Sequence, residues 1–196
     1  MTQDRAPRPG GPSADPDGAD VRAAQSDRAA FGVLYRRYLD RVYGYSFYLL
    51  GDHHDAEDAT ERTFLAALGA IDGFRDQGAT FRAWLFRIAH NQVANALRSR
   101  ARRPSAPLDL VDEPIATDDP ATAVAAWDDA RRVRRALSSL TDDRRQVLVL
   151  RFVDGLSARE IGAVLDRSEG AVRVLQHRAL RELGSVLEGG ERGEGV

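Results

Sequence analysis

The residues of this chain best suited to chemistry are its arginines, which supply all 28 of its cationic side chains. Six of them, and no acid, fall within residues 81–103, and a second block at residues 131–187 has twelve arginines against seven acids. A planar guanidinium suits a phosphate or a guanine edge. The two blocks therefore predict contact with a polyanion. Solvated helix faces would give the same charge pattern, and charge alone leaves both interpretations open.

A second chemical candidate is the pair His53 and His54, which lies between Asp52 and Asp55. An enzyme built on this cluster is one alternative hypothesis for the chain. Adjacent side chains diverge on a helix, and no other histidine is near in the sequence, so we expect no metal site. The chain also has no cysteine, no Gly-rich phosphate loop and no nucleophile elbow. We therefore expect no catalytic residue and no cofactor, and a reducing cytoplasm as its compartment.

Composition divides the chain into two modules and three polar segments. Residues 1–25 are rich in Pro, Gly and Asp, which is typical of a disordered tail and not of a signal peptide. Residues 104–128 combine prolines with acids and predict a flexible acidic linker, and residues 188–196 predict a second disordered tail. No apolar run approaches the ~20 residues of a membrane span. The modules are then residues 26–103 and residues 129–187.

Helical periodicity runs through the first module. Apolar residues recur at three- and four-residue steps from Phe31 to Leu49, and Gly51 ends that pattern. We expect Asp55 to cap the next helix, whose exposed side carries acids and which continues to Leu68. After a loop at residues 72–80, a basic helix over residues 81–103 buries Trp84, Leu85, Ile88 and Val93 and exposes Arg82, Arg87, Arg98, Arg100, Arg102 and Arg103.

The second module predicts a helix-turn-helix at residues 157–183. Ser157 and Glu160 have the spacing of a capping box, and Gly155 ends the helix before them, whose apolar set includes Phe152. Ser168 caps a final basic helix that extends to about residue 187. Two helices joined by a tight turn, the second of them basic, are typical of DNA-binding proteins. The fold class predicted for the whole chain is all-α, with two helical domains joined by a flexible linker.

Both modules resemble the extracytoplasmic-function (ECF) sigma factors of the sigma-70 family, in the family's order. Residues 55–64 are similar to the second conserved region of sigma factors, and residues 81–91 with Leu97 and Arg98 are similar to the segment that reads the minus-10 promoter element. Residues 157–183 resemble the fourth region, which reads the minus-35 element. The chain departs from the common pattern at Glu61, where Gln is frequent, at Gly162, where Ala is frequent and the change looks harmless, and at Val174, where a small polar residue is frequent.

The resemblance implies a role for each of three residue sets. The set that would bind core RNA polymerase, through its beta and beta-prime subunits, comprises Glu57, Asp58, Glu61 and Phe64. The set that would bind the minus-10 element comprises Phe74, Arg75, Thr80, Arg87, Asn91 and Arg98, with Phe74 or Phe81 stacking on a base pulled from the helix. The set that would bind the minus-35 element comprises Arg173, Val174, His177 and Arg178.

The expected function is that of a transcription initiation factor that lends promoter recognition and strand opening to RNA polymerase. Its expected partners are core polymerase, promoter DNA and an anti-sigma factor, without a membrane span. A helix-turn-helix regulator that binds duplex DNA without polymerase is the other alternative, and only the first module argues against it.

Overall fold

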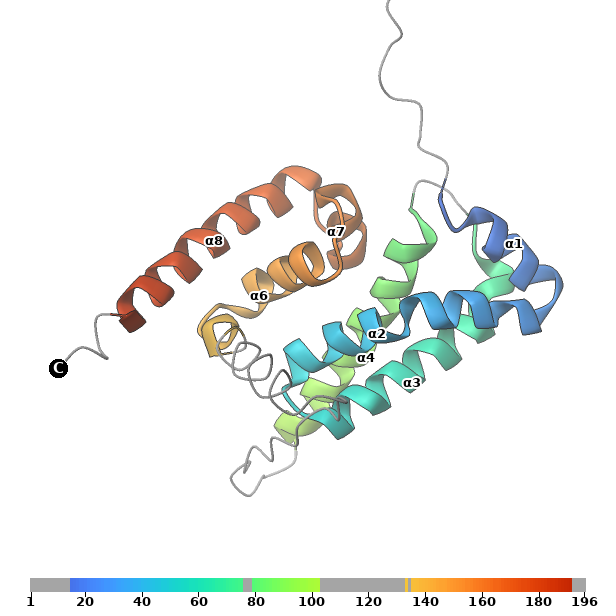
Figure 1. The fold of residues 1–196 in the computed structure, drawn as a ribbon, viewed down its shortest axis with the longest axis horizontal. Helices are drawn as coiled ribbons and strands as arrows, with labels where there is room; N and C mark the ends of the chain where they lie inside the picture. Colours follow the sequence, from blue (N-terminus) through green and yellow to red (C-terminus); the bar gives the residue numbers. More distant parts are fainter. Residues whose placement is uncertain (1–14, 76–78, 103–132, 134, 192–196) are drawn as a thin grey trace, which may run out of the picture.

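The computed structural model describes residues 15–75, 79–102, 133 and 135–191, and the regular secondary structure in this part of the chain is helical. In the first module, α2 (Phe31–Leu50), α3 (His53–Ala70) and α4 (Phe81–Arg102) pack on one another. α1 (Gly18–Ser26) lies across one end of α2, and η1 (Arg28–Ala30) and η2 (Ile71–Gly73) are short 3-10 turns (Figure 1). The predictions of an all-α chain and of two helical domains are confirmed.

The bundle follows from apolar stripes that the sequence places at helical spacing. Leu34, Val42 and Tyr45 of α2 are fully buried against Leu85 and Phe86 of α4 in the common core. α2 ends at Gly51, whose φ of 72° is left-handed and therefore favours glycine. Packing of these stripes fixes α4 against α2 and α3.

The predicted cap of α3 is wrong by three residues. Asp52, not Asp55, is the N-cap, and its carboxylate accepts a hydrogen bond of 2.8 Å from the backbone N–H of Asp55. Asp55 lies in the first turn and forms an ion pair with Arg100, which also donates to the carbonyl of Leu50. Arg100 therefore joins the end of α4 to the start of α3, and is not a free surface cation as the sequence suggested.

The prediction of a disordered tail over residues 1–25 is wrong for its last third. Residues 18–26 form α1, and Asp17 just before it is only 2% exposed. Its carboxylate accepts hydrogen bonds from Tyr38 (2.5 Å) and from Arg37, both on α2. A buried, paired carboxylate and the apolar contacts of Val21 give this segment the interactions that its Pro- and Gly-rich composition concealed. Residues 1–14 lie outside the described part of the chain.

The second module consists of α6 (Asp142–Leu148), the π-helical turn η3 (Val149–Val153), α7 (Ala158–Leu165) and α8 (Glu169–Glu191). Val147, Leu148, Val149 and Leu150 are all buried, whereas a regular helix with one solvent-exposed face would expose at least one of four successive residues. The wider π turn changes the helical phase, so Phe152 is 62% exposed and is not the core residue that the sequence predicted. Gly155, with φ of 64°, ends the element as expected.

The helix-turn-helix prediction is confirmed. Ser157 and Glu160 form a reciprocal capping box at the start of α7, and Asp166 makes the turn with a left-handed φ of 55°. Gly162 faces the turn so closely that an added Cβ would lie 2.5 Å from the carbonyl oxygen of Arg167. Alanine at this position is therefore not the harmless change that the sequence suggested, because the close contact is with backbone. α8 continues to Glu191, so the predicted tail from residue 188 begins too early.

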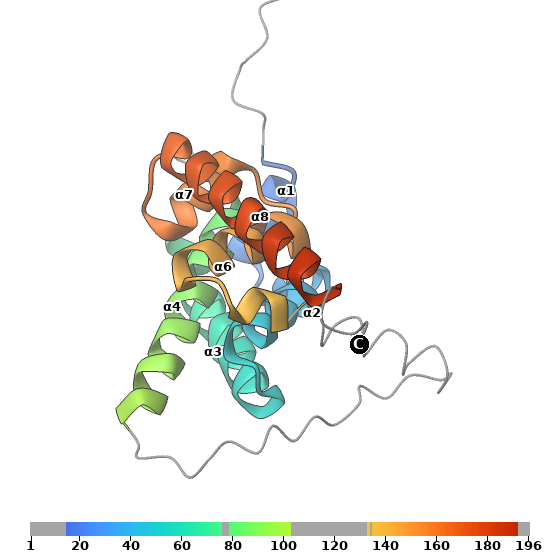
Figure 2. The same ribbon diagram turned by 90° about the vertical axis from the view of Figure 1, so that its left-hand side faces the viewer.

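The two modules are in direct contact. α7 packs against α4, and η3 packs against α2, so that the second module lies along one side of the first (Figures 1 and 2). The side chain of Val153 lies 3.7 Å from the position that a Cβ on Gly44 would take, so the α2 backbone approaches η3 closely. The predicted linker at residues 104–128 lies outside the described residues.

Candidate nucleic-acid and polymerase interfaces

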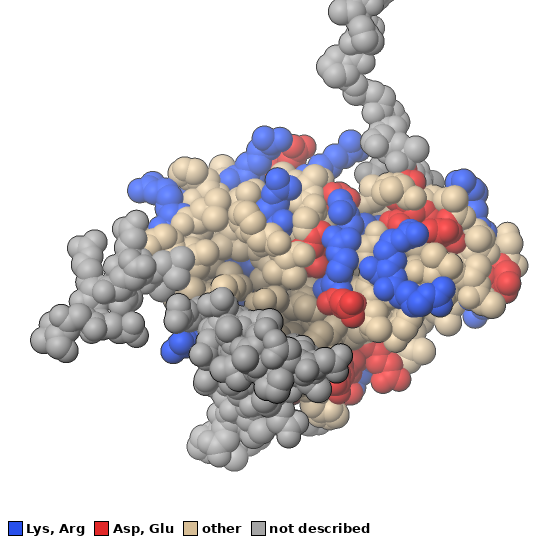
Figure 3. All heavy atoms as spheres, in the orientation of Figure 1, with Lys and Arg blue, Asp and Glu red and all other residues tan. Residues whose placement is uncertain are grey.

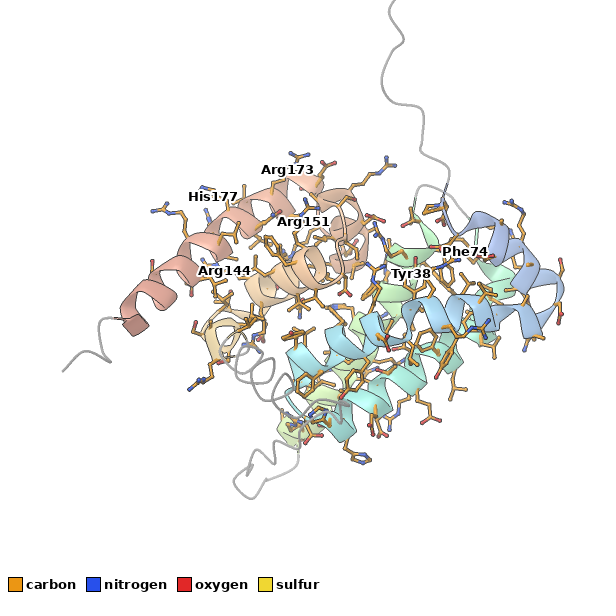
Figure 4. The ribbon with its side chains drawn as sticks, viewed as in Figure 1. Tyr38, Phe74, Arg144, Arg151, Arg173 and His177 are labelled. Carbon is orange, nitrogen blue, oxygen red and sulfur yellow. The ribbon has the colours of Figure 1, made fainter. Side chains whose placement is uncertain are left out.

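The predicted minus-35 residues form one exposed stripe at the start of α8. Arg173, Val174, His177 and Arg178 are all exposed, whereas Val172 and Ala179 on the other side are fully buried. Ser168 caps the helix by accepting from the N–H of Ala171 at 3.2 Å. Figure 4 shows Arg173 and His177 at the outer edge of the module, and Figure 3 shows arginines gathered along the same edge. The structure thus brings all four predicted residues together on a face free of the first module.

Arg173 is already paired within its own helix. Its guanidinium donates to Glu169 at 2.5 and 3.2 Å, one turn earlier on α8. Both side chains are largely exposed, so the pair is weak and easily exchanged. Arg173 remains available for a base edge or phosphate.

Three of the predicted minus-10 residues share a face of α4. Arg87, Asn91 and Arg98 are exposed and follow one another at steps of four and seven residues. The carboxamide of Asn91 offers a donor and an acceptor to solvent. Arg98 donates to the side chain of Asn95 at 2.5 Å, which extends the same face by one polar residue that sequence reasoning missed.

The other minus-10 residues lie differently from their prediction. Phe74 is 8% exposed and Phe81 is fully buried; they pack on Trp84 with ring centroids 5.1 and 5.6 Å from it. Neither ring is free to stack on a base, because the core needs an apolar closure between η2 and α4. Arg75 donates to the carbonyls of Asp72 and Phe74 at 2.8 Å, and Thr80 donates to Glu160 at 2.8 Å. Residues 76–78 of this loop lie outside the described residues.

The predicted polymerase-binding acids do not share one face. Glu57 and Glu61 line a groove of about 520 Å³ between α2 and α3, with Phe64 at its floor. Phe64 is only 5% exposed and packs against Tyr35 with ring centroids 4.8 Å apart. Asp58 instead faces the α4 side of α3, where it pairs with Arg62 at 3.1 Å. Successive residues of a helix point about 100° apart around its axis, so Asp58 points away from the side of α3 that Glu57 occupies.

The groove also carries apolar residues that the sequence did not single out for polymerase. Leu65 is 61% exposed and Tyr35 is 40% exposed, and both line the groove beside Glu57 and Glu61. An exposed apolar surface rimmed by acids is typical of a protein-binding site for a basic partner.

One of the two histidines, His53, is part of the packing of the first module, whereas His54 is exposed. His53 stacks on Phe47, with ring centroids 4.3 Å apart, and hydrogen-bonds the hydroxyl of Tyr43. Within the described residues no three His, Cys, Asp or Glu side chains lie together as metal ligands would.

Glu160 makes contacts between the two modules that sequence reasoning missed. The sequence predicts for it only a place in a capping box, a local motif, as the third residue of α7. Its carboxylate also accepts hydrogen bonds from Arg82 and Thr80 of the first module. Burial by itself would raise its pKa, but the bonds from Arg82, Ser157 and Thr80 lower it to about 2.

Comparison with known proteins agrees with both modules. Residues 34–103 match the family described as Sigma-70 region 2, and residues 136–184 match Sigma-70, region 4. The chain is 37% identical over 182 residues to the ECF RNA polymerase sigma factor BldN of Streptomyces coelicolor, covering 90% of this chain and 69% of BldN. The chain is an ECF sigma factor of the sigma-70 family.

Two further relatives show that the likeness covers both modules. The ECF sigma factor SigW of Bacillus subtilis is 31% identical over 174 residues, which cover 83% of this chain and 91% of SigW. The solved structure of CnrH in complex with the cytosolic domain of CnrY superposes with a TM-score of 0.69 at 30% identity, over 88% of this chain and 97% of CnrH.

As an ECF sigma factor the protein directs RNA polymerase to promoters, binding core enzyme and promoter DNA, and it is not an enzyme. Each helix in the described ranges is too short or too polar to cross a lipid bilayer.

Proposed function

We propose that α8 reads the minus-35 element as duplex and that α4 reads the minus-10 element as it opens. The observation that supports this division is that each module presents one exposed stripe of arginines with amide or imidazole groups, on a helix fixed by a buried opposite face. The general function follows from membership of the ECF family. We assign that function to the residues of these two stripes.

On α8, Arg173 and Arg178 bind guanine edges or phosphates, and His177 adds a further donor. Val174 is 50% exposed within the same stripe and contacts a thymine methyl. Glu169 releases Arg173 when DNA supplies a stronger anion.

On α4, Asn91 binds the edge of a minus-10 base through its donor and acceptor, and Arg87 and Arg98 bind neighbouring phosphates. Arg75 and Thr80 contact the strand at the loop before α4. Phe74 and Phe81 support that loop from the core and do not stack on the base.

The groove between α2 and α3 docks on core polymerase. Glu57 and Glu61 form ion pairs with a basic helical segment of the beta-prime and beta subunits, while Leu65 and Tyr35 provide apolar contact. Phe64 shapes the floor of the groove. Asp58, on the other side of α3, is outside this docking surface.

We propose that the protein works in the cytoplasm, where core polymerase and promoter DNA are found. An anti-sigma factor restrains it, since an unrestrained sigma factor competes for polymerase continuously. The CnrH structure that this chain resembles holds CnrH in complex with another protein segment, the cytosolic domain of CnrY.

Run-off transcription with core polymerase and a genomic promoter library tests the proposal, with permanganate footprinting of thymines near the start site. Strand opening is expected only when both the protein and core are present. Opening by the protein alone, or none with core on any promoter, would contradict it. Tight, specific binding to duplex promoter without core would instead favour an ordinary helix-turn-helix regulator.

A further inference from the structure

The contact between the two modules centres on one carboxylate. Arg82 donates three hydrogen bonds of 2.7 to 3.1 Å to both oxygens of Glu160, and the hydroxyl of Thr80 donates a fourth at 2.8 Å. The side chains of Arg82 and Glu160 are 28% and 13% exposed, so the pair is largely withdrawn from solvent. A fifth hydrogen bond, from Arg41 to the carbonyl of Asp154, joins the modules nearby.

The groups that hold Glu160 are those that hold a phosphate. A guanidinium that grips two oxygens, assisted by a hydroxyl, binds a phosphodiester in the same way as a carboxylate. Arg82 and Thr80 also belong to the part of the first module that, in the proposed function, binds the melted strand. Thr80 lies in the loop before α4, and Arg82 lies in the first turn of α4, ahead of Arg87 and Asn91.

The closed arrangement of the two modules is incompatible with a promoter. Elements centred 35 and 10 base pairs before the start site are about 85 Å apart, at about 3.4 Å per base pair. Here α7 packs directly on α4. Thirty residues separate Arg102 from Val133, a chain that reaches at most about 110 Å when extended. The modules must therefore separate on DNA, and separation exposes Arg82 and Thr80.

We propose that Arg82 and Thr80 form a phosphate-binding site for the opened minus-10 strand, and that Glu160 fills this site when the modules are closed. The inference rests on the proposed function of α4. Strand phosphate and Glu160 then exclude one another, so that binding of the strand and closure of the two modules are coupled with opposite sign.

A charge-removing variant separates this role from the capping role of Glu160. Glu160→Gln keeps a side chain that serves equally well in a capping box, but gives up the negative charge that Arg82 binds. Glu182→Gln is the matched control, because Glu182 pairs with Arg144 inside the second module, away from α4. Arg82→Ala breaks the closed contact and also removes the phosphate ligand.

Two measurements on the full chain decide the matter. The first is the affinity for a labelled oligo(dT) strand at several salt concentrations. The second is the distance between the modules by energy transfer, with dyes on Ala66→Cys and Leu180→Cys; both positions are exposed, and the chain has no other cysteine.

Glu160→Gln should bind oligo(dT) about five- to tenfold more tightly than the wild type and show less energy transfer, while Glu182→Gln matches the wild type. Arg82→Ala should also lose energy transfer, yet bind more weakly than Glu160→Gln, with a salt slope lower by about one. Oligo(dT) should lower energy transfer in the wild type.

Equal oligo(dT) affinity in Glu160→Gln and Glu182→Gln would overturn the inference, as would Arg82→Ala binding as tightly as Glu160→Gln. Failure of the proposed function is distinguishable, because it appears as an absence of promoter opening by the wild type with core. Normal opening together with unchanged oligo(dT) binding in Glu160→Gln rejects only the shared phosphate site.

Discussion

Arg41 of α2 donates a hydrogen bond to the backbone carbonyl of Asp154, across the contact between the two modules. The carboxylate of Asp154 itself is fully buried, and neither of its oxygens has a hydrogen-bond partner among the described residues. Burial raises its pKa to about 8, against the smaller opposing effects of Arg41 and Arg82. An ionisable group is thus enclosed where the modules meet.

Closure of the modules should weaken as pH rises from about 4 to about 8. In this range the buried Asp154 holds a proton that an exposed aspartate has released, so the closed form binds more protons and loses stability as pH rises. Glu160, with its pKa lowered to about 2, stays ionised throughout the same range. Energy transfer between the dyes on α3 and α8 should therefore fall with pH in the wild type and stay flat in Asp154→Asn. A pH dependence that survives in Asp154→Asn would assign the effect to another group.

Gly162→Ala should destabilise the second module by about 1–3 kcal/mol, because the new Cβ meets the backbone carbonyl of Arg167 at 2.5 Å. Gly170→Ala is the matched control: it lies in the first turn of α8 with no atom within 4 Å of an added Cβ. That change should stabilise the helix by about 0.5–1 kcal/mol. Urea unfolding of both variants measures the difference, and equal effects would show that the helix-turn-helix accommodates the extra methyl.

Charge reversal on α3 should weaken polymerase binding only when the substituted acids line the groove between α2 and α3. Glu57→Arg with Glu61→Arg should weaken binding to core about tenfold or more, because both acids line the groove between α2 and α3. Asp58→Arg should change it little, since Asp58 faces away from that groove. Titration of labelled protein with core enzyme measures both. A larger loss for Asp58→Arg would move the docking surface to the α4 side of α3.

Asn91→Ala should reduce open-complex formation more than closed-complex binding, because the proposed contact of Asn91 is with a melted strand. A lost base contact costs about 1–3 kcal/mol. Gln92→Ala is a fitting control, since the neighbouring amide is half-buried and lines the pocket between α3 and α4. Permanganate reactivity and filter binding on the same promoter separate the two steps. Equal opening by Asn91→Ala and Gln92→Ala would remove Asn91 from base reading.

Sequence periodicity predicted most of the helices and both modules, because their stability rests on apolar stripes and local caps. Ser157 and Glu160 located α7 correctly for this reason. The error in the N-terminal segment arose because one residue there acts over a long sequence distance. Asp17 pairs with α2, and its buried position is invisible in a segment rich in Pro and Gly.

Among the site residues, too, some positions could be predicted from the sequence and others could not. Exposed positions on regular helices, such as Asn91 and Arg173, lie where the helical period placed them. The resemblance predicts that Phe74 contacts DNA, yet its ring closes the core against Trp84. Only the packing of the second module on the first could reveal that Glu160 serves both a local cap and a contact with Arg82.

The segment before residue 26 holds the loop before α4 in place, so proteolysis of this segment would affect that loop. Asp15 accepts a hydrogen bond of 2.5 Å from the backbone N–H of Phe81, the first residue of α4, and Gln25 donates to the carbonyls of Ile71 and Phe74 at 2.9 and 3.0 Å. One end of the loop before α4 is thus tied to α1 through Gln25, and the other to Asp15, just before α1. A protease that trims the chain to residue 26 would release that loop while leaving the groove between α2 and α3 whole. Under the proposed function, the product would still occupy polymerase but open promoters poorly, and so would act as a dominant inhibitor of the intact protein.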